Sequence, residues 1–373
     1  MFPRVTCRLT LAACALACAS SAWAGDVNIS GLLDLNLASV QPSYAGGNGA
    51  FNYNNTQRNR ATVVSASGRS ESRLTFDGKE SLGASARVLF QLETAISADT
   101  GSADSQRFWN RQARVGVQDD DWGQLWVGRS QTVYWDVLKA FTPFGEAAYG
   151  PAVRLMLQNP LMTDLYSYQM EISGVTSAAR STALNALRVP SWDNSLSYTL
   201  PTLTDLEGLT TAVQFGLKES DPNGFNLAVA SSYDGEDMDA GFAFQSVKAG
   251  LPASLAMRND QWIFALAYDA SYARLFLQLG QNKLALGNNS IRSNYQQIGA
   301  SVPLDEALSV QTSVARLSNK PLSSWHQQFN LGAAYVFSKQ TDAYADYIGE
   351  QVRSVGRKLP AGHSLVIGVR HRY

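Results

Sequence analysis

The sequence predicts an all-β fold, a 16-stranded antiparallel transmembrane β-barrel in which one long loop folds inward. Three observations predict this class. Apolar residues recur at every second position in segments of about ten residues, which is the period of a strand and the length that a tilted strand needs to cross a bilayer. Short turns and long polar connections alternate between these segments. Charged residues make up only 16% of the chain, below the roughly 25% of soluble proteins.

The first 24 residues have the layout of a secretory signal peptide. Two arginines precede an apolar run over residues 9–19, and the segment closes on Ala22-Trp23-Ala24, an A-x-A cleavage site. We expect residues 1–24 to be removed and residues 25–373 to form the barrel. The stretch Leu11-Ala12-Ala13-Cys14 also resembles a lipoprotein cleavage box. Cleavage there would leave an apolar run of about five residues, shorter than the roughly 7–15 of a signal peptide.

All three cysteines, Cys7, Cys14 and Cys18, lie in this leader, so the expected mature chain has no disulfide. It holds 28 basic and 31 acidic residues, a net charge of −3. No global field therefore points to nucleic acid or to an anionic membrane surface. After the leader no run of roughly 18 apolar residues occurs, which excludes a transmembrane helix. No cofactor and no metal site are predicted.

The clearest strand covers residues 327–338, where Phe329, Leu331, Ala333, Tyr335 and Phe337 share one face. The opposite face is mostly small or polar, so one side of this strand is apolar. The same alternation, read along the chain, predicts sixteen strands. They lie near residues 27–38, 70–80, 84–97, 108–119, 123–131, 190–200, 208–218, 225–234, 238–248, 260–270, 272–282, 293–302, 307–318, 327–338, 341–352 and 362–373.

The connections fall into two kinds. Short turns are expected near residues 119–121, 234–236, 269–271, 303–305 and 338–340, and longer loops at 41–69 and 282–292, among others. Short turns at one end and long loops at the other are typical of an outer-membrane barrel. A soluble all-β repeat such as a propeller is the alternative. It would carry Lys, Glu and Thr on its outward faces, where most strands here carry Leu, Val, Phe and Tyr.

Several motifs occur in order along the expected mature chain. Residues 72–83 read SRLTFDGKESLG, residues 87–94 read RVLFQLET, residues 122–129 read WGQLWVGR, and the chain ends GVRHRY. Together they resemble the motifs of Gram-negative general porins, in particular the neisserial and Bordetella-like branch. The last residue is Tyr373, where that family usually ends in Phe.

The resemblance implies a water-filled channel in the outer membrane of a Gram-negative bacterium, through which small hydrophilic solutes and ions diffuse passively. It implies a homotrimer of sixteen-stranded barrels, each narrowed by an inward-folded third loop. The implied partners are outer-membrane lipids, lipopolysaccharide and, during biogenesis, the barrel assembly machinery and periplasmic chaperones.

Residues 131–188 interrupt the alternation. A run this long without strand signals in a compact domain is commonly functional, so we interpret residues 132–188 as the constriction loop. The loop is neutral, where relatives tend to be acidic. Its acids are Asp136, Glu146, Asp164 and Glu171, and its bases are Lys139, Arg154, Arg180 and Arg188.

A passive pore selects ions where charges of both signs face each other across a narrow point. Strand parity predicts that Arg73, Arg87 and Arg114 face the lumen. By resemblance, Arg73 and Arg129 match basic wall positions of the family, and Arg188 lies at a comparable place. Arg129 has the parity of lipid-facing residues, so it reaches the pore only if its strand ends or bulges there. Alternatively, each arginine is an ordinary solvated side chain of the lumen with no special role in selectivity.

On the loop side the candidates are Asp136, Glu146 and Lys139. A neutral loop opposite an arginine wall predicts a pore that is weakly anion-selective or poorly selective. At the end of the chain, Leu365, Ile367, Val369, His371 and Tyr373 alternate with other residues. This pattern resembles the signal that the outer-membrane assembly machinery reads.

Three other classes of function are compatible with parts of the sequence. An outer-membrane hydrolase would need His326, His363 or His371, but no G-x-S-x-G, HExxH or Cys/His motif is present, so no enzyme is predicted. A substrate-specific outer-membrane channel stays open because the loop has an apolar centre at residues 151–162. An adhesin or receptor that does not conduct is the third.

Overall fold

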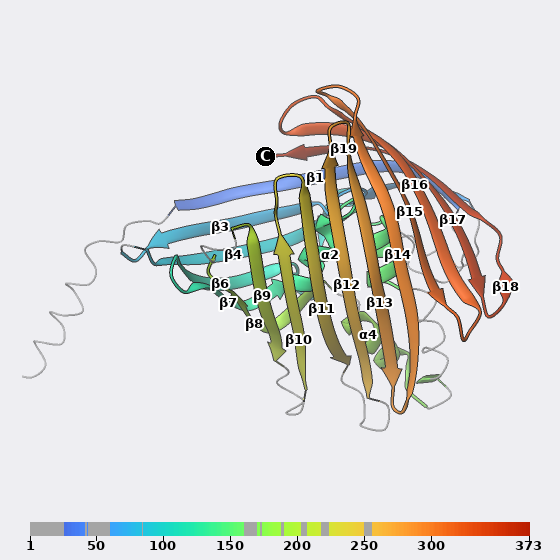
Figure 1. The fold of residues 1–373 in the computed structure, drawn as a ribbon, viewed down its shortest axis with the longest axis horizontal. Helices are drawn as coiled ribbons and strands as arrows, with labels where there is room; N and C mark the ends of the chain where they lie inside the picture. The colour runs from blue at the N-terminus through green and yellow to red at the C-terminus, as the bar shows by residue number, and fades with distance from the viewer. Residues whose placement is uncertain are drawn as a thin grey trace, which may run out of the picture.

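The computed structural model describes residues 26–41, 43, 60–83, 85–159, 170–171, 174–187, 190–202, 207–217, 224–249 and 256–373. Within them the strands form one antiparallel sheet that closes on itself between β1 and β19, as predicted (Figure 1). Sixteen long strands make the wall. They are β1 (Asp26–Gln41), β3 (Arg73–Ser81), β4 (Arg87–Ser97), β6 (Gln112–Asp119), β7 (Gly123–Gln131), β8 (Ser191–Thr199), β9 (Leu209–Leu217), β10 (Phe225–Tyr233), β11 (Met238–Ala249), β12 (Met257–Ala270), β13 (Ala273–Leu286), β14 (Asn289–Pro303), β15 (Leu308–Asn319), β16 (Ser324–Val336), β17 (Thr341–Ser354) and β19 (Gly362–Arg372).

The closure joins the two ends of the chain. Gly31 N donates to Tyr373 O at 3.1 Å, and Tyr373 N donates to Gly31 O at 3.2 Å. A Cβ at Gly31 would clash with Cζ and the hydroxyl oxygen of Tyr373 and would lie 2.8 Å from Arg73 O, so glycine leaves room for this side chain. An aromatic ring covering a strand glycine fixes register in β-barrels. The last residue therefore stabilises the seam of the barrel.

Three short strands extend the loops: β2 (Ala61–Ala66), β5 (Ser102–Ala103) and β18 (Arg357–Lys358). β2 pairs with the second half of β1, and β3 pairs with its first half. β2 and β3 thus continue each other across residues 67–72, where Ser67 has a φ of 67°. This interruption brings Arg69 and Glu71 out of the regular strand pattern.

The alternation along the strands is inverted relative to a soluble protein. On β19 the side chains of Leu365, Ile367 and Val369 are 49–54% exposed, whereas Val366 between them is buried. On β16, Phe329 and Leu331 are exposed, whereas Gln328 and Asn330 are buried. An exposed apolar face around a closed sheet is the lipid-facing surface of a membrane barrel.

One predicted loop is wrong. β13 runs to Leu286 and β14 starts at Asn289, so two residues connect them in place of the long loop expected at residues 282–292. Gly287 has a φ of 55°, which supplies the left-handed conformation that a tight hairpin needs. The polar, Asn-rich sequence made this hairpin look like a loop.

The segment between β7 and β8 contains helices, which the loss of strand alternation did not indicate. Among the described residues they include α2 (Val133–Ala140), the π-helix η1 (Ala152–Leu157) and α4 (Ser177–Ala186). Thr132 caps α2, because its Oγ1 accepts a hydrogen bond from Trp135 N at 3.1 Å. No helix in the described part of the chain is long and apolar enough to span a membrane.

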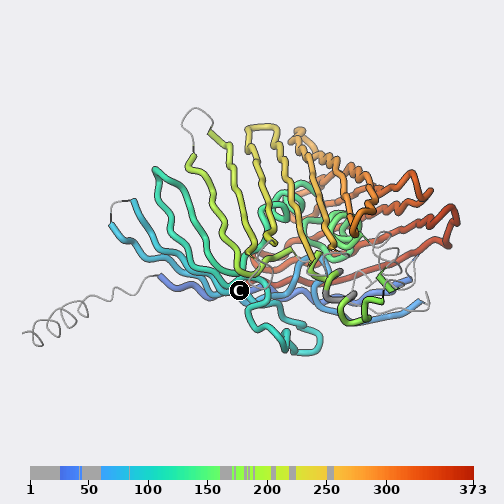
Figure 2. Tube along the Cα trace, turned by 90° about the horizontal axis from the view of Figure 1, so that it is seen from below, coloured from blue at the N-terminus to red at the C-terminus, as the bar shows by residue number. Residues whose placement is uncertain are grey.

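This segment packs on the buried face of the sheet. Gln278 donates to Leu138 O at 2.9 Å, and Gln261 donates to Met156 O at 2.9 Å. Apolar residues of α2 and η1 form one buried cluster with small residues of the strands, namely Ala230, Ala243, Ala265, Ala267 and Ala315. In Figure 2 the helices lie beside the strands of this part of the sheet.

Glycines on these strands permit the close approach. A Cβ at Gly241 would lie 2.7 Å from Phe141 Cε2, and one at Gly299 would lie 2.8 Å from Pro143 Cγ. The strands that carry these glycines are therefore packed directly against the segment between β7 and β8.

Candidate functional site

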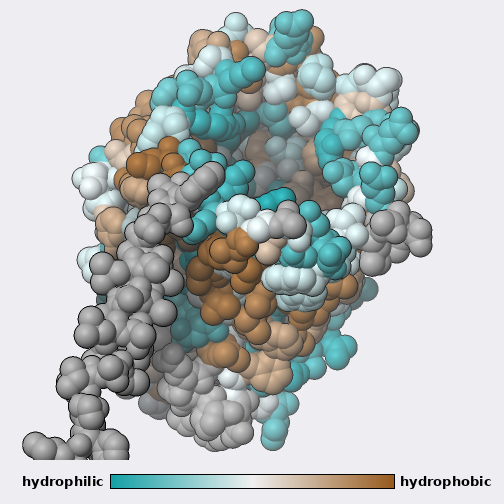
Figure 3. Space-filling model, turned by 90° about the vertical axis from the view of Figure 1, so that its left-hand side faces the viewer, coloured by the Kyte–Doolittle hydropathy of each residue, from teal (hydrophilic) through white to brown (hydrophobic). Residues whose placement is uncertain are grey.

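Two cavities lie beside this packed cluster, and Trp135, Val153 and Leu157 of the cluster line one of them. The loop-end cavity, about 530 Å³, is bordered by the β4–β6 connection and carries Glu71, Asp99, Asp104, Arg111 and Glu146. The turn-end cavity, about 630 Å³, is bordered by the β16–β17 turn and carries Arg69, Lys139, Glu146, Lys339, Asp342, Arg370 and Arg372. Only one charged side chain, that of Glu146, lines both of these cavities. Figure 3 shows a hollow in the surface rimmed largely by hydrophilic residues.

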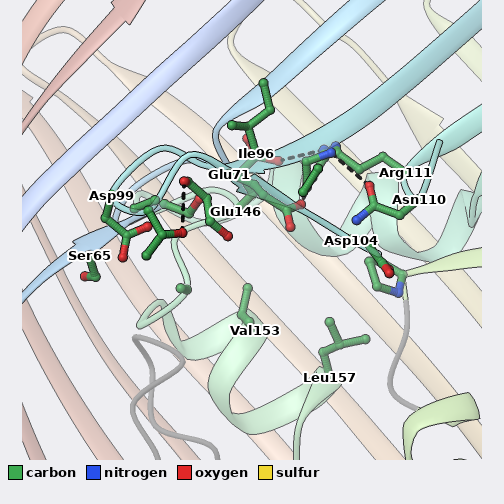
Figure 4. A pocket seen from close by; sticks show the side chains of 18 of the residues that line it. Ser65, Glu71, Ile96, Asp99, Asp104, Asn110, Arg111, Glu146, Val153 and Leu157 are labelled. Atoms are coloured by element: carbon green, nitrogen blue, oxygen red, sulfur yellow. Dashed lines mark hydrogen bonds and ion pairs between the residues drawn. The ribbon is translucent and has the colours of Figure 1, made fainter. Parts of the chain in front are cut away.

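Glu146 lies between α2 and η1 and meets two arginines of the barrel wall. Arg73 Nη1 lies 2.6 Å from Glu146 Oε1, and Arg111 Nη2 lies 3.6 Å from Glu146 Oε2. Arg111 Nε also donates to Glu93 Oε1 at 2.5 Å and pairs with Glu71. We call Glu71, Arg73, Glu93, Arg111 and Glu146 the Glu146 cluster. In Figure 4, Glu71 and Glu146 lie together, with Val153 and Leu157 of η1 across the cavity.

Three different elements position this cluster. Arg73 is the first residue of β3, Glu93 lies on β4, and Arg111 immediately precedes β6. Thr75 donates to Glu93 Oε2 at 2.9 Å, which holds that carboxylate toward Arg111. Burial raises the pKa of Glu146, but attraction to Arg73, Arg111 and Lys139 outweighs it. The pKa therefore lies below its ordinary value, and Glu146 is ionised at neutral pH.

A buried network fixes the chain three residues beyond Glu146. Asp346 on β17 binds Arg69 through both carboxylate oxygens, at 2.8 and 2.5 Å, and accepts a hydrogen bond from the Tyr149 hydroxyl. Gln328 donates to Tyr149 O at 2.5 Å. A bidentate guanidinium–carboxylate pair is geometrically specific. This network therefore holds Glu146 opposite Arg73.

A further contact fixes η1. Arg154 Nε lies 3.3 Å from Glu350 Oε1 on β17, and His326 Nε2 lies 3.5 Å from the same oxygen. All three side chains are nearly inaccessible to solvent. Within the described residues, no group of three or more His, Cys, Asp or Glu could hold a metal ion.

Comparison with known proteins decides the family. The family model of Gram-negative porins matches residues 9–349. The chain belongs to the Gram-negative porins. It is thus a passive channel protein of the outer membrane of a Gram-negative bacterium.

Similar proteins agree with this assignment. An outer membrane porin protein of Bordetella pertussis is 25% identical over 350 residues, covering 87% of this chain and 86% of its own length. Outer membrane porin protein 32 of Delftia acidovorans is 24% identical over 386 residues, covering 97% and 99%. Among solved structures, the anion-selective porin from Comamonas acidovorans has a TM-score of 0.73 at 20% identity, covering 94% of this chain and all of that one. The trimer form of OmpT from Vibrio cholerae has a TM-score of 0.67 at 13% identity, covering 94% and 100%.

The structure brings some of the sequence-predicted residues together. Arg73 and Glu146 form an ion pair in the cluster. Lys139 lines the turn-end cavity, where its Nζ lies 2.7 Å from Asp136 Oδ1. Arg114 donates to Gln91 Oε1 at 2.6 Å and stacks over the Trp126 ring at 4.2 Å.

Other predicted residues lie elsewhere in the porin. Arg87 is near the β3–β4 turn, 3.9 Å from Asp120, and both are well exposed. The bulge that Arg129 requires is present, as the β7–β8 register shifts between Gly128 and Ser130. Arg129 Nη1 there pairs with Asp193 at 2.8 Å. Arg188 lies outside the described residues.

Arg69, Glu71 and Arg111 were not predicted. Glu71 has the inward parity of Arg73, which was a usable signal. Arg111 has the parity of lipid-facing residues in the expected strand 108–119, and Arg69 precedes the expected strand 70–80, so parity did not indicate either of them. Glu93 has the inward parity of Gln91 on β4, which was a usable signal. The interruption at residues 67–72 depends on backbone geometry that no local sequence pattern indicated.

Proposed function

We propose that residues 132–188 fold into the lumen as the constriction loop and that the Glu146 cluster is the narrow point of a poorly selective, weakly anion-preferring pore. One observation carries this proposal: Glu146, on the loop, pairs with Arg73 on the wall and lines both cavities. Charges of both signs meeting across a narrow point create a field that acts on every passing ion.

The weak selectivity follows from the balance of charge. The cluster holds two arginines and three carboxylates, whereas the turn-end cavity holds five basic and two acidic side chains. The Comamonas relative carries the description anion-selective, which favours the same sign here. We propose that Arg73 and Arg114 form the basic wall of the constriction. Lys139 and Asp136 are proposed as charges on the loop side. Arg87 and Arg129 are proposed only as lumen charges of the outer parts of the pore. For Arg188 the basic-wall role at the constriction stays a proposal.

Reversal potentials test the proposal directly. In a tenfold KCl gradient across a planar bilayer, we expect a chloride-to-potassium permeability ratio above one but within about threefold of it. A clear preference for potassium would contradict the assignment of sign. Any single-channel conductance would exclude an adhesin or receptor that has no pore.

A substrate-specific channel is a second candidate, favoured by one observation. Trp135, Val153, Leu157 and Ile96 give the loop-end cavity an apolar side opposite its charges. Liposome swelling with sugars, amino acids and dicarboxylates of graded size separates the two candidates. A general pore sorts these solutes by size alone, whereas a specific channel passes one class faster than smaller members of another.

We also propose that this porin is a homotrimer, since the OmpT relative has a trimer form. Its proposed partners are outer-membrane lipids, lipopolysaccharide, periplasmic chaperones and the assembly machinery. No enzymatic activity is proposed. Two of the histidines that a hydrolase would need have other partners. His363 is hydrogen-bonded to Tyr347, and His371 is hydrogen-bonded to Thr341.

Deleting Tyr373 should lower the yield of inserted porin several-fold. Tyr373 supplies both backbone bonds to Gly31 at the seam, and its ring covers that glycine. Leu365, Ile367, Val369 and His371 present the exposed face that we propose as the rest of the assembly signal. Heat-modifiable mobility of outer-membrane fractions on gels measures the yield. Tyr373→Phe is the control and should assemble normally; equal yields for the deletion would contradict the prediction.

A further inference from the structure

The charges of the two cavities differ along the pore axis. The loop-end cavity carries four acidic side chains and one basic side chain, Arg111. The turn-end cavity carries five basic and two acidic side chains. Glu146 is counted in both, because it marks the boundary between them.

Ion pairing leaves this difference in place. In the part of the chain that the structure describes, Asp99 and Asp104 at the loop end form no salt bridge, and both are exposed. At the turn end, Arg370 and Arg372 share the single carboxylate of Asp342, at 2.8 and 2.9 Å. Lys339 there is exposed and has no ion-pair partner among the described residues. Among the described residues, acidic side chains without a salt bridge therefore lie on one side of Glu146 and an excess of basic side chains over carboxylates lies on the other.

We propose that this porin rectifies ion current, conducting better when the loop side is positive. The inference rests on the proposed function, because it places the Glu146 cluster between the two cavities. Cations gather in the acidic cavity and anions in the basic one, since each wall attracts its counter-ions. A voltage that is positive on the loop side drives both toward Glu146, so carriers accumulate at the narrow point. The opposite voltage withdraws both, and the narrow point is depleted.

The size of the effect depends on salt. Charges act over about 10 Å at 0.1 M ionic strength and about 3 Å at 1 M. Rectification by wall charge must therefore weaken as salt rises. Rectification that comes from an asymmetric pore shape would persist at high salt.

Single-channel recordings in symmetric KCl test the proposal. At 0.1 M and about 100 mV of either sign, we expect the current with the loop side positive to exceed the opposite current by at least about 1.3-fold. At 1 M the ratio should approach one. The orientation of each channel is assigned with the Lys320→Cys variant, whose cysteine lies in the exposed β15–β16 connection and carries biotin. Streptavidin added to one chamber binds only channels whose loop side faces that chamber. The expected mature chain has no other cysteine.

Charge variants identify the source. Asp99→Asn with Asp104→Asn, or Lys339→Gln with Arg372→Gln, should each reduce the ratio, and all four together should remove it. Lys320→Gln, which changes an exposed loop-side charge that lines neither cavity, should leave the ratio unchanged. A linear current in the unmodified porin, the opposite sign, or a ratio unaffected by the four substitutions would overturn the inference. A linear but conducting channel would leave the proposed function intact, whereas absence of conductance would defeat both.

Discussion

Glu146→Gln should make the porin distinctly anion-selective and raise its chloride-to-potassium permeability ratio about fivefold. The substitution removes one negative charge at the boundary of the two cavities, within 2.6 Å of Arg73. A unit charge about 4 Å away contributes about 1 kcal/mol in water, and salt screening reduces this to about 0.5 kcal/mol for each ion. The effect has opposite sign for chloride and potassium, so their permeability ratio changes about fivefold. Arg111 keeps Glu71 and Glu93 as partners, so the cluster remains folded.

Two comparisons make this result specific. Glu171→Gln removes a charge from the same loop but from a residue that lines neither cavity, and it should leave the ratio near that of the unmodified porin. Arg73→Ala with Arg114→Ala should shift the ratio in the opposite direction, toward potassium. If Glu146→Gln and Glu171→Gln gave the same ratio, Glu146 would not lie at the narrow point.

Acid should reproduce the Glu146→Gln phenotype, but only at low pH. The neighbouring cations depress the pKa of Glu146 below its ordinary value of 4.5. A carboxylate with a depressed pKa stays charged above that range and is protonated only as pH falls through the folded value. Selectivity should therefore be flat between pH 7 and about pH 5. The permeability ratio is measured against pH for the unmodified porin and for Glu146→Gln. Any change of the ratio with pH in the variant comes from other carboxylates, so the difference between the two curves gives the titration of Glu146.

Asp346→Asn should raise single-channel conductance and make the open state noisy. This substitution removes the carboxylate that binds Arg69 and Tyr149, and with it the anchor of the loop near Glu146. Breaking a buried ion pair costs about 3–5 kcal/mol, because the remaining charge is left unpaired. Water can hydrate Arg69 if the loop moves aside, so the loop rather than the barrel should yield.

The barrel itself provides the controls for this variant. Asp260→Asn changes a carboxylate of β12 that pairs with Arg258 of the same strand and accepts from Ser246 of β11, so these partners belong to the barrel wall. It should conduct as the unmodified porin does. Tyr149→Phe removes only the hydroxyl donor and should give a smaller change of the same kind as Asp346→Asn. Unchanged conductance in Asp346→Asn, with normal heat-modifiable mobility, would show that this network does not hold the pore narrow.

The wall of the barrel was predictable because each strand obeys a simple physical rule. Residues such as Leu365 and Ile367 must face lipid, and a strand places every second residue on that side. The same rule placed Arg73 and Arg114 on the opposite face. It gave Arg111 the parity of lipid-facing residues in the expected strand 108–119, and Arg69 lies before the expected strand 70–80.

The loop was recognisable only because it lacks the strand alternation of apolar residues. The helices described in it, among them α2, η1 and α4, follow no membrane-strand period. The packing of α2 on small strand residues such as Gly241 is a long-range property. Glu146 was predicted as a candidate because it is one of few acids in the loop. Glu146 is positioned by its partner Arg111 and by the Arg69–Asp346 anchor. Both depend on the interruption of the second barrel strand at residues 67–72.

One measurement tests most directly whether Glu146 lies in the narrow point between the two cavities. Glu146→Cys places a single thiol there, since the three natural cysteines all lie in the first 24 residues. Small, membrane-impermeant thiol reagents are added to either chamber during single-channel recording, with Lys320→Cys as the labelled control. We predict that modification occurs from both sides and lowers conductance by about half, while the control is labelled without a change in current. Complete labelling of Glu146→Cys with unchanged conductance would contradict the proposed constriction.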